Sequence, residues 1–351
     1  MVFRDKIGNM RIAKSNNDEI MVTVMVTFYN QKKYVFESLS AIFNQKTNFR
    51  YEVICGDDGS NDGTYEELLA WKEKYSNMCT VLQMPRDAEK KYEPIVRVSN
   101  NRYNMLKNAK GKYVIFIDGD DYFTDFYKLQ KQVDLLEEHP ECVACGHPVS
   151  VVWEDDLQKT GEMCHIADEP VIITKKIYWA YLWIHADALL FRNIFLDKED
   201  KINKDFFDDN LIACYFIKYG DMIYIPDKMV AYRQITNSSW NKRNEFEKAL
   251  VNIWMYSESK KVVPEMRLQC FVRCYFAWQW FYKNRKNMIE FEYTGDFEKY
   301  DNIVKDSYKY SSSNIFYKIW YEIKYFIPIH FGKVINKSAK IKERYYKKLI
   351  I

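Results

Sequence analysis

Residues 113–123 read YVIFIDGDDYF, a strand-like apolar run that ends in three carboxylates within four positions. The five residues before Asp118 are apolar and are typical of a buried strand. The negative charges of Asp118, Asp120 and Asp121 repel one another at this spacing, so the motif indicates that a positive group binds there. Carboxylate oxygens suit Mg²⁺ or Mn²⁺, and a cation held by so few protein ligands often also holds phosphate oxygens. The stretch therefore predicts a metal together with a diphosphate.

The spacing of the carboxylates adds a geometric expectation. Asp118 and Asp120 are two residues apart, so they point to the same side if the chain stays extended. Asp121 falls where the strand gives way to a turn and could join or support the site. Because acidic triplets also occur in ordinary surface turns, the motif alone does not identify a metal site, and the surrounding sequence has to be considered.

The context is a regular alternation of strands and helices. Apolar, β-branched runs predict strands at 21–29, 51–56 and 80–84, and amphipathic periodicity predicts helices at 33–44, 65–74 and 99–109. Together with 113–118 this alternation predicts an α/β fold with a doubly wound sheet and helices on both faces. Ligands bind at the carboxyl ends of the strands in such sheets. The polar clusters 27–30, 57–60 and 118–121 are therefore expected at one edge.

The pattern changes after residue 140. CVACGHPVSVVW (142–153) is interpreted as one strand, 175–185 and 206–219 as helices, 222–234 as a strand pair, and 241–351 as mainly helical. Cys142 and Cys145 form a CxxC motif near His147, but a zinc site needs four ligands. The simpler interpretation is a strand with two buried thiols.

Composition narrows the class of protein. The 351 residues are 48% hydrophobic and carry a net charge of +3, so nucleic acid is not expected as a partner. Eight scattered cysteines are no disulfide framework and favour a reducing, cytoplasmic location. The N-terminus is too polar for a signal peptide, and no apolar run reaches the roughly 18 residues of a membrane span.

The C-terminus suggests a surface contact. Residues 315–331 are densely aromatic, and residues 330–351 hold seven Lys/Arg against one Glu. This pattern fits a peripheral site on the inner face of an anionic membrane. A helix packed on the protein is the alternative, and the aromatic segment could equally pair two chains as a homo-oligomer.

Four blocks in order carry a family resemblance. They are VMVTFYNQKKYVFESLSAIFNQ (24–45), VICGDDGSNDGT (53–64), AKGKYVIFIDGDDYF (109–123) and FFDDNLIACYFIKYGDMIYIPDKMVAYRQITNSSW (206–240). The sequence resembles family 2 glycosyltransferases, inverting enzymes with a GT-A-type fold. The resemblance implies a doubly wound mixed sheet flanked by helices, with a mainly helical C-terminal extension. It divides the chain into an N-terminal extension (1–20), a nucleotide-binding half (21–125), an acceptor-binding half (126–240) and a helical region with the basic aromatic tail (241–351).

The resemblance also assigns residues to the donor site. Thr27 and the aromatic Tyr29 would line the uracil pocket, and Asp58 would accept a hydrogen bond from the base. Arg97 and Arg102 are candidates for contacts to phosphate or ribose. Relatives often carry Arg-Asn-x-Gly where this chain has RYNM at 102–105, which leaves the 85–105 segment open.

The acidic residues receive the remaining catalytic roles. Asp118, Asp120 and Asp121 would hold the ribose and the metal, Mn²⁺ or Mg²⁺. Asp209 matches the general base, because Asp208 falls where relatives usually carry a structural Glu. Both lie in the first turn of a helix, where the dipole favours the charged form.

The acceptor is expected between the sheet edge and residues 175–190. Trp183, His185 and Asp187 match positions that line the acceptor pocket in relatives, and Trp179 or Trp183 could stack on a sugar ring. A tryptophan on a helix is more often part of the core, and His185 could be a core histidine.

The function that follows is a metal-dependent inverting transfer of a hexosyl or N-acetylhexosaminyl group. The donor is expected to be a UDP-sugar, and the acceptor a hydroxyl of a surface glycan or lipid-linked saccharide. One alternative, a nucleotidyltransferase, lacks the expected glycine-rich phosphate loop. A dehydrogenase would need GxGxxG after the first strand. A non-catalytic glycan- or partner-binding module of the same fold is the third alternative, and the intact carboxylates weigh against it.

Overall fold

The computed structural model describes residues 19–264 together with 284, 314–316 and 319; within the long range it leaves out 88–89, 91, 157, 176–177, 179–181, 197–201, 206, 237 and 239. The expected N-terminal extension and most of the basic aromatic tail lie outside the described residues. No described helix combines the length and the apolar character that crossing a membrane requires.

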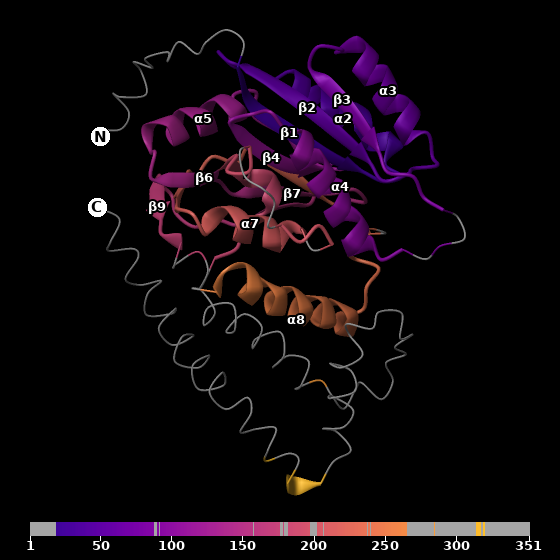
Figure 1. Ribbon diagram of the computed structural model, residues 1–351, viewed down its shortest axis with the longest axis vertical. Coiled ribbons are helices and arrows are strands. Elements are labelled where there is room, and N and C mark those ends of the chain that lie inside the picture. The colour runs from indigo at the N-terminus through magenta and orange to yellow at the C-terminus, as the bar shows by residue number, and fades with distance from the viewer. Residues whose placement is uncertain are drawn as a thin grey trace.

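The main sheet is mixed and has eight described strands in the order β3-β2-β1-β4-β10-β6-β11-β9 (Figure 1). Their bounds are β1 Ile20–Phe28, β2 Arg50–Asp57, β3 Cys79–Gln83, β4 Tyr113–Asp118, β6 Cys142–Gly146, β9 Val171–Ile173, β10 Leu190–Arg192 and β11 Asp221–Tyr224. Strand β1 runs parallel to β2 and β4, whereas β10 runs antiparallel to β4. Val24, Met25 and Val26 in β1 are all fully buried, as expected for a central strand covered on both faces.

Helices cover both faces of this sheet. The described helices are α2 Lys32–Phe43, α3 Thr64–Lys74, α4 Pro94–Asn108, α5 Lys128–Glu138, α7 Asp209–Ile217, α8 Glu245–Val262 and the short 3₁₀ helix η1 Ala186–Ala188. The chain moves from β1 to β2 to β3 in one direction and returns to β4 on the other side of β1. Right-handed crossovers then place α2 and α3 on one face and α4 on the other. The doubly wound mixed sheet is confirmed.

The reversal of direction creates a switch point between β1 and β4. In such sheets the ligand crevice lies outside the carboxyl ends of the strands at this point. Thr27 of β1 is paired in register with Asp118 of β4 and with Gly56 of β2. The acidic motif therefore begins where the topology predicts a binding site.

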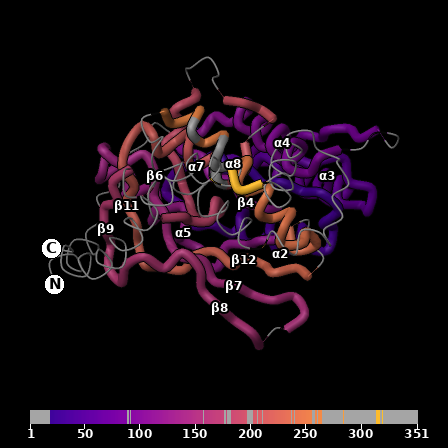
Figure 2. Tube along the Cα trace, turned by 90° about the horizontal axis from the view of Figure 1, so that it is seen from below, coloured from indigo at the N-terminus to yellow at the C-terminus, as the bar shows by residue number. Residues whose placement is uncertain are grey.

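A second sheet was not expected from the sequence. It has the order β5-β12-β7-β8, with bounds Tyr122–Phe123, Val230–Gln234, Val149–Trp153 and Thr160–Met163, and β7 and β8 project from the body in Figure 2. The stretch 142–153 is thus two strands in different sheets, β6 and β7. His147 and Pro148 separate them, and proline cannot donate a backbone hydrogen bond within a strand. Strand β5 follows Asp121 directly and pairs with β12, which ties the acidic motif to the 230–234 segment.

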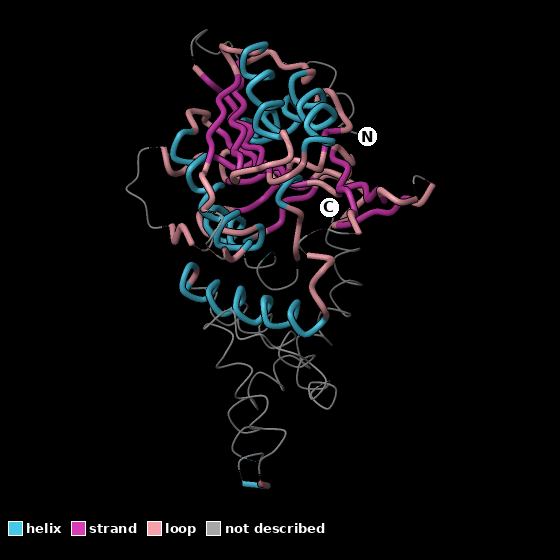
Figure 3. Tube along the Cα trace, turned by 90° about the vertical axis from the view of Figure 1, so that its right-hand side faces the viewer, coloured by secondary structure: helices cyan, strands magenta, loops and turns pink. Residues whose placement is uncertain are grey.

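The structure gives the exact starts of two helices that the sequence predicted only approximately. Helix α4 begins at Pro94, five residues before the predicted start, with proline in the first helical turn, where its missing N–H is not needed. Helix α8 opens the expected helical region with a capping box between Asn244 and Glu247. It crosses beneath the sheets and packs against α7 (Figure 3).

Candidate active site

The carboxyl end of β4 is joined to β1 by a side-chain hydrogen bond. Thr27 Oγ1 donates to Asp118 Oδ1 at 2.6 Å. The Nη2 group of Arg102 donates to the same oxygen at 2.7 Å. Hydrogen bonds from β1 and α4 therefore orient the carboxylate of Asp118.

Arg102 also reaches the start of α7. Its Nη1 lies 2.5 Å from Asp209 Oδ1, so one guanidinium bridges Asp118 and Asp209. Arg102 is 3% exposed. Burial alone would lower its pKa, but the charges of Asp209 and Asp118 raise the pKa of the guanidinium above its usual value. The arginine is thus a fixed buried cation between two carboxylates.

The two adjacent aspartates at the start of α7 have different structural roles. Asp208 is the N-cap, and its Oδ1 accepts a hydrogen bond from the Leu211 N–H at 3.1 Å. Asp209 is the first helical residue, and its side chain, 32% exposed, turns to Arg102. The structure therefore separates a helix-capping carboxylate from one that faces the site.

The acidic motif itself forms a turn. The Asp121 N–H donates to the Asp118 carbonyl at 3.0 Å, so the strand gives way to a turn before Asp121, as expected. The extended chain that would point Asp118 and Asp120 to the same side is therefore not present. Arg233 braces this turn, donating from Nε to the Asp120 carbonyl at 2.8 Å. Burial and the neighbouring charge of Asp118 raise the pKa of Asp120 to about 7. The carboxylate of Asp120 forms no ion pair within the described part of the chain.

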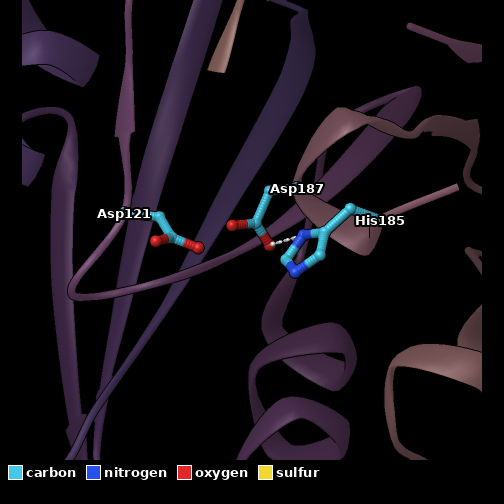
Figure 4. Close-up of side chains that lie close together, drawn as sticks. All are labelled: Asp121, His185 and Asp187. Carbon is cyan, nitrogen blue, oxygen red and sulfur yellow. Dashed lines mark ion pairs between the residues drawn. The ribbon is translucent and has the colours of Figure 1, made fainter. Parts of the chain in front are cut away.

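The side chain of Asp121 meets the segment around η1. Figure 4 shows its carboxylate facing that of Asp187, with His185 on the far side of Asp187. The distance from His185 Nδ1 to Asp187 Oδ1 is 3.5 Å. All three residues are buried, at 1%, 4% and 1% exposure for Asp121, His185 and Asp187. This trio is called the buried Asp-His-Asp cluster below.

Charges within the cluster shift each pKa. Burial and the charge of Asp187 raise the pKa of Asp121 well above its usual range. Burial opposes ionisation of Asp187, but the charge of His185 lowers the pKa of this carboxyl overall. Burial likewise opposes protonation of His185, yet Asp187 raises the pKa of the imidazole to about 9.

A third group surrounds Asp58 at the end of β2. Arg97 Nε donates to its Oδ1 at 2.6 Å, and Arg86 pairs with its Oδ2. The Arg86 guanidinium lies over the ring of Tyr29, 3.9 Å from the centroid, and Tyr29 is 43% exposed. A carboxylate, two arginines and a partly exposed tyrosine ring thus gather at one edge of the sheet.

The structure sorts the predicted site residues into these groups. Thr27 is joined directly to Asp118, and Arg102 joins Asp118 to Asp209. Tyr29, Asp58 and Arg97 form the group at β2. Trp183 is half-buried with its ring edge-on to His185, 5.6 Å between centroids. Trp179 lies outside the described residues.

Sequence reasoning gave one arginine a different role and missed another. It treated Arg102 as a candidate for phosphate or ribose, and nothing in the sequence indicated that Arg102 pairs with both Asp118 and Asp209. Arg86 was not identified, because nothing in its local pattern distinguishes it from the other arginines of the chain.

Comparison with known proteins matches part of the chain to a protein family and to individual relatives. Residues 23–195 match the family described as "Glycosyl transferase family 2". The uncharacterized protein Rv1520 of Mycobacterium tuberculosis is 28% identical over 236 residues, which cover 63% of this chain and 60% of that protein. The chain thus aligns with less than two thirds of this relative's length. The poly(ribitol-phosphate) beta-N-acetylglucosaminyltransferase TarS of Staphylococcus aureus is 33% identical over 122 residues, 33% of this chain and 19% of that protein.

Solved structures confirm the GT-A-type fold. The mannosyltransferase PcManGT from Pyrobaculum calidifontis, in complex with GDP-Man and Mn²⁺, is 16% identical, covers 98% of this chain and 94% of its own, and superposes with a TM-score of 0.51. Residues 1–349 of S. aureus TarS, in complex with UDP-GlcNAc, are 16% identical, cover 83% of this chain and 91% of their own, and give 0.50. At this identity the likeness shows the fold.

Proposed function

Because this chain belongs to glycosyl transferase family 2, we propose that it transfers a sugar from a nucleotide-sugar to an acceptor hydroxyl. The observation that carries the proposal is the Arg102 bridge between Asp118 and Asp209 at the switch point of the sheet. It holds a donor-side carboxylate and a candidate base on opposite sides of one cation. Both carboxylates are thus held next to one site, which supports a transfer between two bound molecules.

The donor base would occupy the group at β2. Arg86 lies over one face of the partly exposed Tyr29 ring, and the other face would stack on the base. Asp58 offers a carboxylate acceptor for a ring N–H. Each Asp58 oxygen already serves an arginine, but a carboxylate has about four acceptor sites in all, so capacity remains. Such an acceptor suits uracil, which supports a UDP-sugar as donor, with Arg97 and Arg86 close to its ribose or phosphates.

The charges of the site fit a divalent cation. Five carboxylates gather near the acidic turn (Asp118, Asp120, Asp121, Asp187 and Asp209), against the buried cations Arg102 and His185. Among the described residues, neither Asp120 nor Asp121 forms an ion pair, and the carboxylate of Asp121 faces that of Asp187. Asp120 and the second oxygen of Asp118 would therefore hold Mn²⁺ or Mg²⁺ next to the donor diphosphate. A cation bound there supplies positive charge that stabilises the departing nucleoside diphosphate.

Asp209 would act as the general base. Arg102 holds one of its oxygens, and partial exposure leaves the other for the acceptor hydroxyl. The carboxylate takes the hydroxyl proton while the hydroxyl oxygen attacks the anomeric carbon. The bond to the diphosphate breaks on the opposite side, so the configuration inverts and no covalent intermediate forms.

The acceptor would bind beside the segment of Trp183, His185 and Asp187. The half-buried Trp183 provides the sugar-stacking surface, whereas the buried His185 and Asp187 hold the segment in place. The acceptor would be a hydroxyl of a surface glycan or a lipid-linked saccharide; the polymer in the name of TarS, poly(ribitol-phosphate), is likewise a hydroxyl-bearing polymer. We retain residues 21–125 as the donor half, 126–240 as the acceptor half, and the basic tail within 241–351 as the candidate contact to a membrane or a second chain.

The decisive experiment measures nucleoside diphosphate release. The full chain is incubated with UDP-, GDP- and other nucleotide-sugars, with and without Mn²⁺, first alone and then with saccharide acceptors. Metal-dependent release from a UDP-sugar, increased by acceptor, supports the proposal. Tight nucleotide-sugar binding with no release under any condition would instead identify a non-catalytic binding module.

A further inference from the structure

The buried Asp-His-Asp cluster is a polar site whose hydrogen bonding is incomplete. Asp121 Oδ2, Asp187 Oδ2 and His185 Nδ1 are buried and have no hydrogen-bond partner in the described part of the chain. An unsatisfied buried polar atom costs about 1–3 kcal/mol, and more if the group is charged. The Asp121 carboxylate faces Asp187, His185 lies on the other side of Asp187, and one donor atom of each residue lies within 4.8 Å of the others (Figure 4), so one bound ligand beside Asp187 would satisfy these atoms.

Neighbouring residues hold the side chains of the cluster in place. Arg233 N–H donates to Asp121 Oδ1 at 2.7 Å, which leaves Oδ2 directed at Asp187. His185 packs against the ring of Tyr232, 4.5 Å between centroids. Supporting contacts of this kind orient the ligands of metal centres.

The geometry and charge suit a divalent transition metal. One donor atom from each residue lies within 4.8 Å of the others. The 3.5 Å separation of His185 Nδ1 and Asp187 Oδ1 is close to the roughly 3.3 Å edge of a tetrahedron with 2.0–2.1 Å bonds, as zinc forms. An ion that binds here displaces the protons that the metal-free cluster holds on His185 and Asp121. The two carboxylates and the imidazole, then neutral, carry two negative charges, which one divalent ion neutralises. Imidazole favours zinc and its neighbours over Mg²⁺.

We propose that Asp121, His185 and Asp187 bind a divalent transition-metal ion, Zn²⁺ or Mn²⁺, in the absence of nucleotide. This ion is separate from the one expected beside the donor diphosphate at Asp118 and Asp120. It fixes the η1 segment, which carries the acceptor-side residues, to the acidic turn that carries the donor-side residues. The proposal rests on the cluster alone and does not depend on the transfer reaction.

The test is metal content without nucleotide. The full-length chain is stripped with a chelator, dialysed against Zn²⁺ or Mn²⁺, desalted, and analysed by mass spectrometry of its metals. The expected result is about one ion per chain and a higher melting temperature than that of the stripped chain. His185→Gln should reduce the metal content at least tenfold.

Two variants control the measurement. His165→Gln removes an exposed histidine that also lies between two carboxylates, Glu162 at 3.0 Å and Asp168 at 3.2 Å, and should keep the ion. Asp120→Asn removes the candidate nucleotide-dependent ligand and should also keep it. If His185→Gln fails to fold, the visible spectrum of the Co²⁺-loaded wild-type chain decides, because it reports nitrogen and oxygen ligation directly.

Either of two results would overturn the proposal. The folded wild-type chain could hold less than a tenth of an equivalent of either ion, with an unchanged melting temperature; the cluster is then a proton-sharing trio. Alternatively, a folded His185→Gln chain could keep the wild-type content. Neither result bears on sugar transfer, which the nucleoside diphosphate assay measures separately.

Discussion

Arg102 Nη1 lies 2.5 Å from Asp209 Oδ1, and the same guanidinium pairs with Asp118, so one buried cation couples the two sides of the candidate active site. The three residues come from α4, β4 and α7. Removing a single partner from such a buried arrangement leaves charge without compensation, which costs more than the interaction itself is worth.

Arg102→Met should therefore destabilise the fold. We expect a loss of about 2–3 kcal/mol in the free energy of unfolding, below the 3–5 kcal/mol range because both carboxylates are about a third exposed. Urea denaturation measures the change. The matched control is Lys112→Gln, which breaks an exposed pair with Glu137 and should cost less than about 1 kcal/mol. Equal stability of the two variants would mean that the Arg102 bridge is not structural.

Asp209→Asn should abolish transfer and retain nucleotide binding. The amide keeps the shape of the carboxylate but cannot take the acceptor proton, so we expect a loss of about 10²–10⁴-fold in the transfer rate. The binding constant for UDP with Mn²⁺ should change less than threefold. Asp208→Ala is the neighbouring control: loss of the N-cap should cost about 1 kcal/mol of stability and leave most of the transfer rate. Retained transfer in Asp209→Asn would remove this residue from the chemistry.

Asp120→Asn should uncouple nucleotide binding from the metal. In the wild-type chain Mn²⁺ is expected to increase UDP affinity, because the ion joins the carboxylate to the diphosphate. Loss of the charge should reduce that increase at least tenfold and leave the metal-free affinity unchanged. Isothermal titration with and without Mn²⁺ gives both values. An unaltered metal effect would move the ion away from Asp120.

Asp58→Asn should weaken UDP binding and lower stability together. The amide leaves Arg86 and Arg97 without their shared anion and changes the acceptor that would face the base. We expect about 2–4 kcal/mol of destabilisation from these buried pairs. The control is Asp87→Asn, whose exposed pair with Lys90 should contribute almost nothing. If UDP affinity survives in a folded Asp58→Asn chain, the base binds elsewhere.

Lys128 should give the protein a stability that rises with pH. Burial lowers the pKa of this fully buried ammonium to about 7; Cys145, Asp187 and Asp125 oppose the shift, and Gln132 accepts its hydrogen bond at 2.6 Å. Between pH 7 and the ordinary lysine pKa near 10.4 the unfolded chain holds a proton that the folded chain lacks. Stability then rises with pH by up to about 1.4 kcal/mol per unit, and below pH 7 this dependence disappears. Lys128→Met removes the titration, so its unfolding free energy should have a smaller slope over pH 7–10. Parallel slopes for both chains would contradict the buried neutral amine.

The local pattern of the sequence predicted most of the fold. Strands β1, β2, β3 and β4 and helices α2, α3 and α7 lie within a few residues of their expected bounds, because burial periodicity and strand propensity act over short distances. The start of α4 at Pro94 was readable from proline at the first turn but was overlooked. The division of 142–153 into two sheets was not readable, because partner strands far along the chain decide it.

What the sequence by itself determined is which residues end the strands: Thr27, Asp58 and Asp118 stand at carboxyl ends that parallel topology brings to one edge. Only the tertiary structure decided which side chains meet there. Arg102 reaches Asp209 across 107 positions of sequence, and Asp121 reaches Asp187 across 66. The physical reason is that charge pairing in a buried site depends on distance in space, and the places of helix α7 and the η1 segment depend on their packing against the sheet.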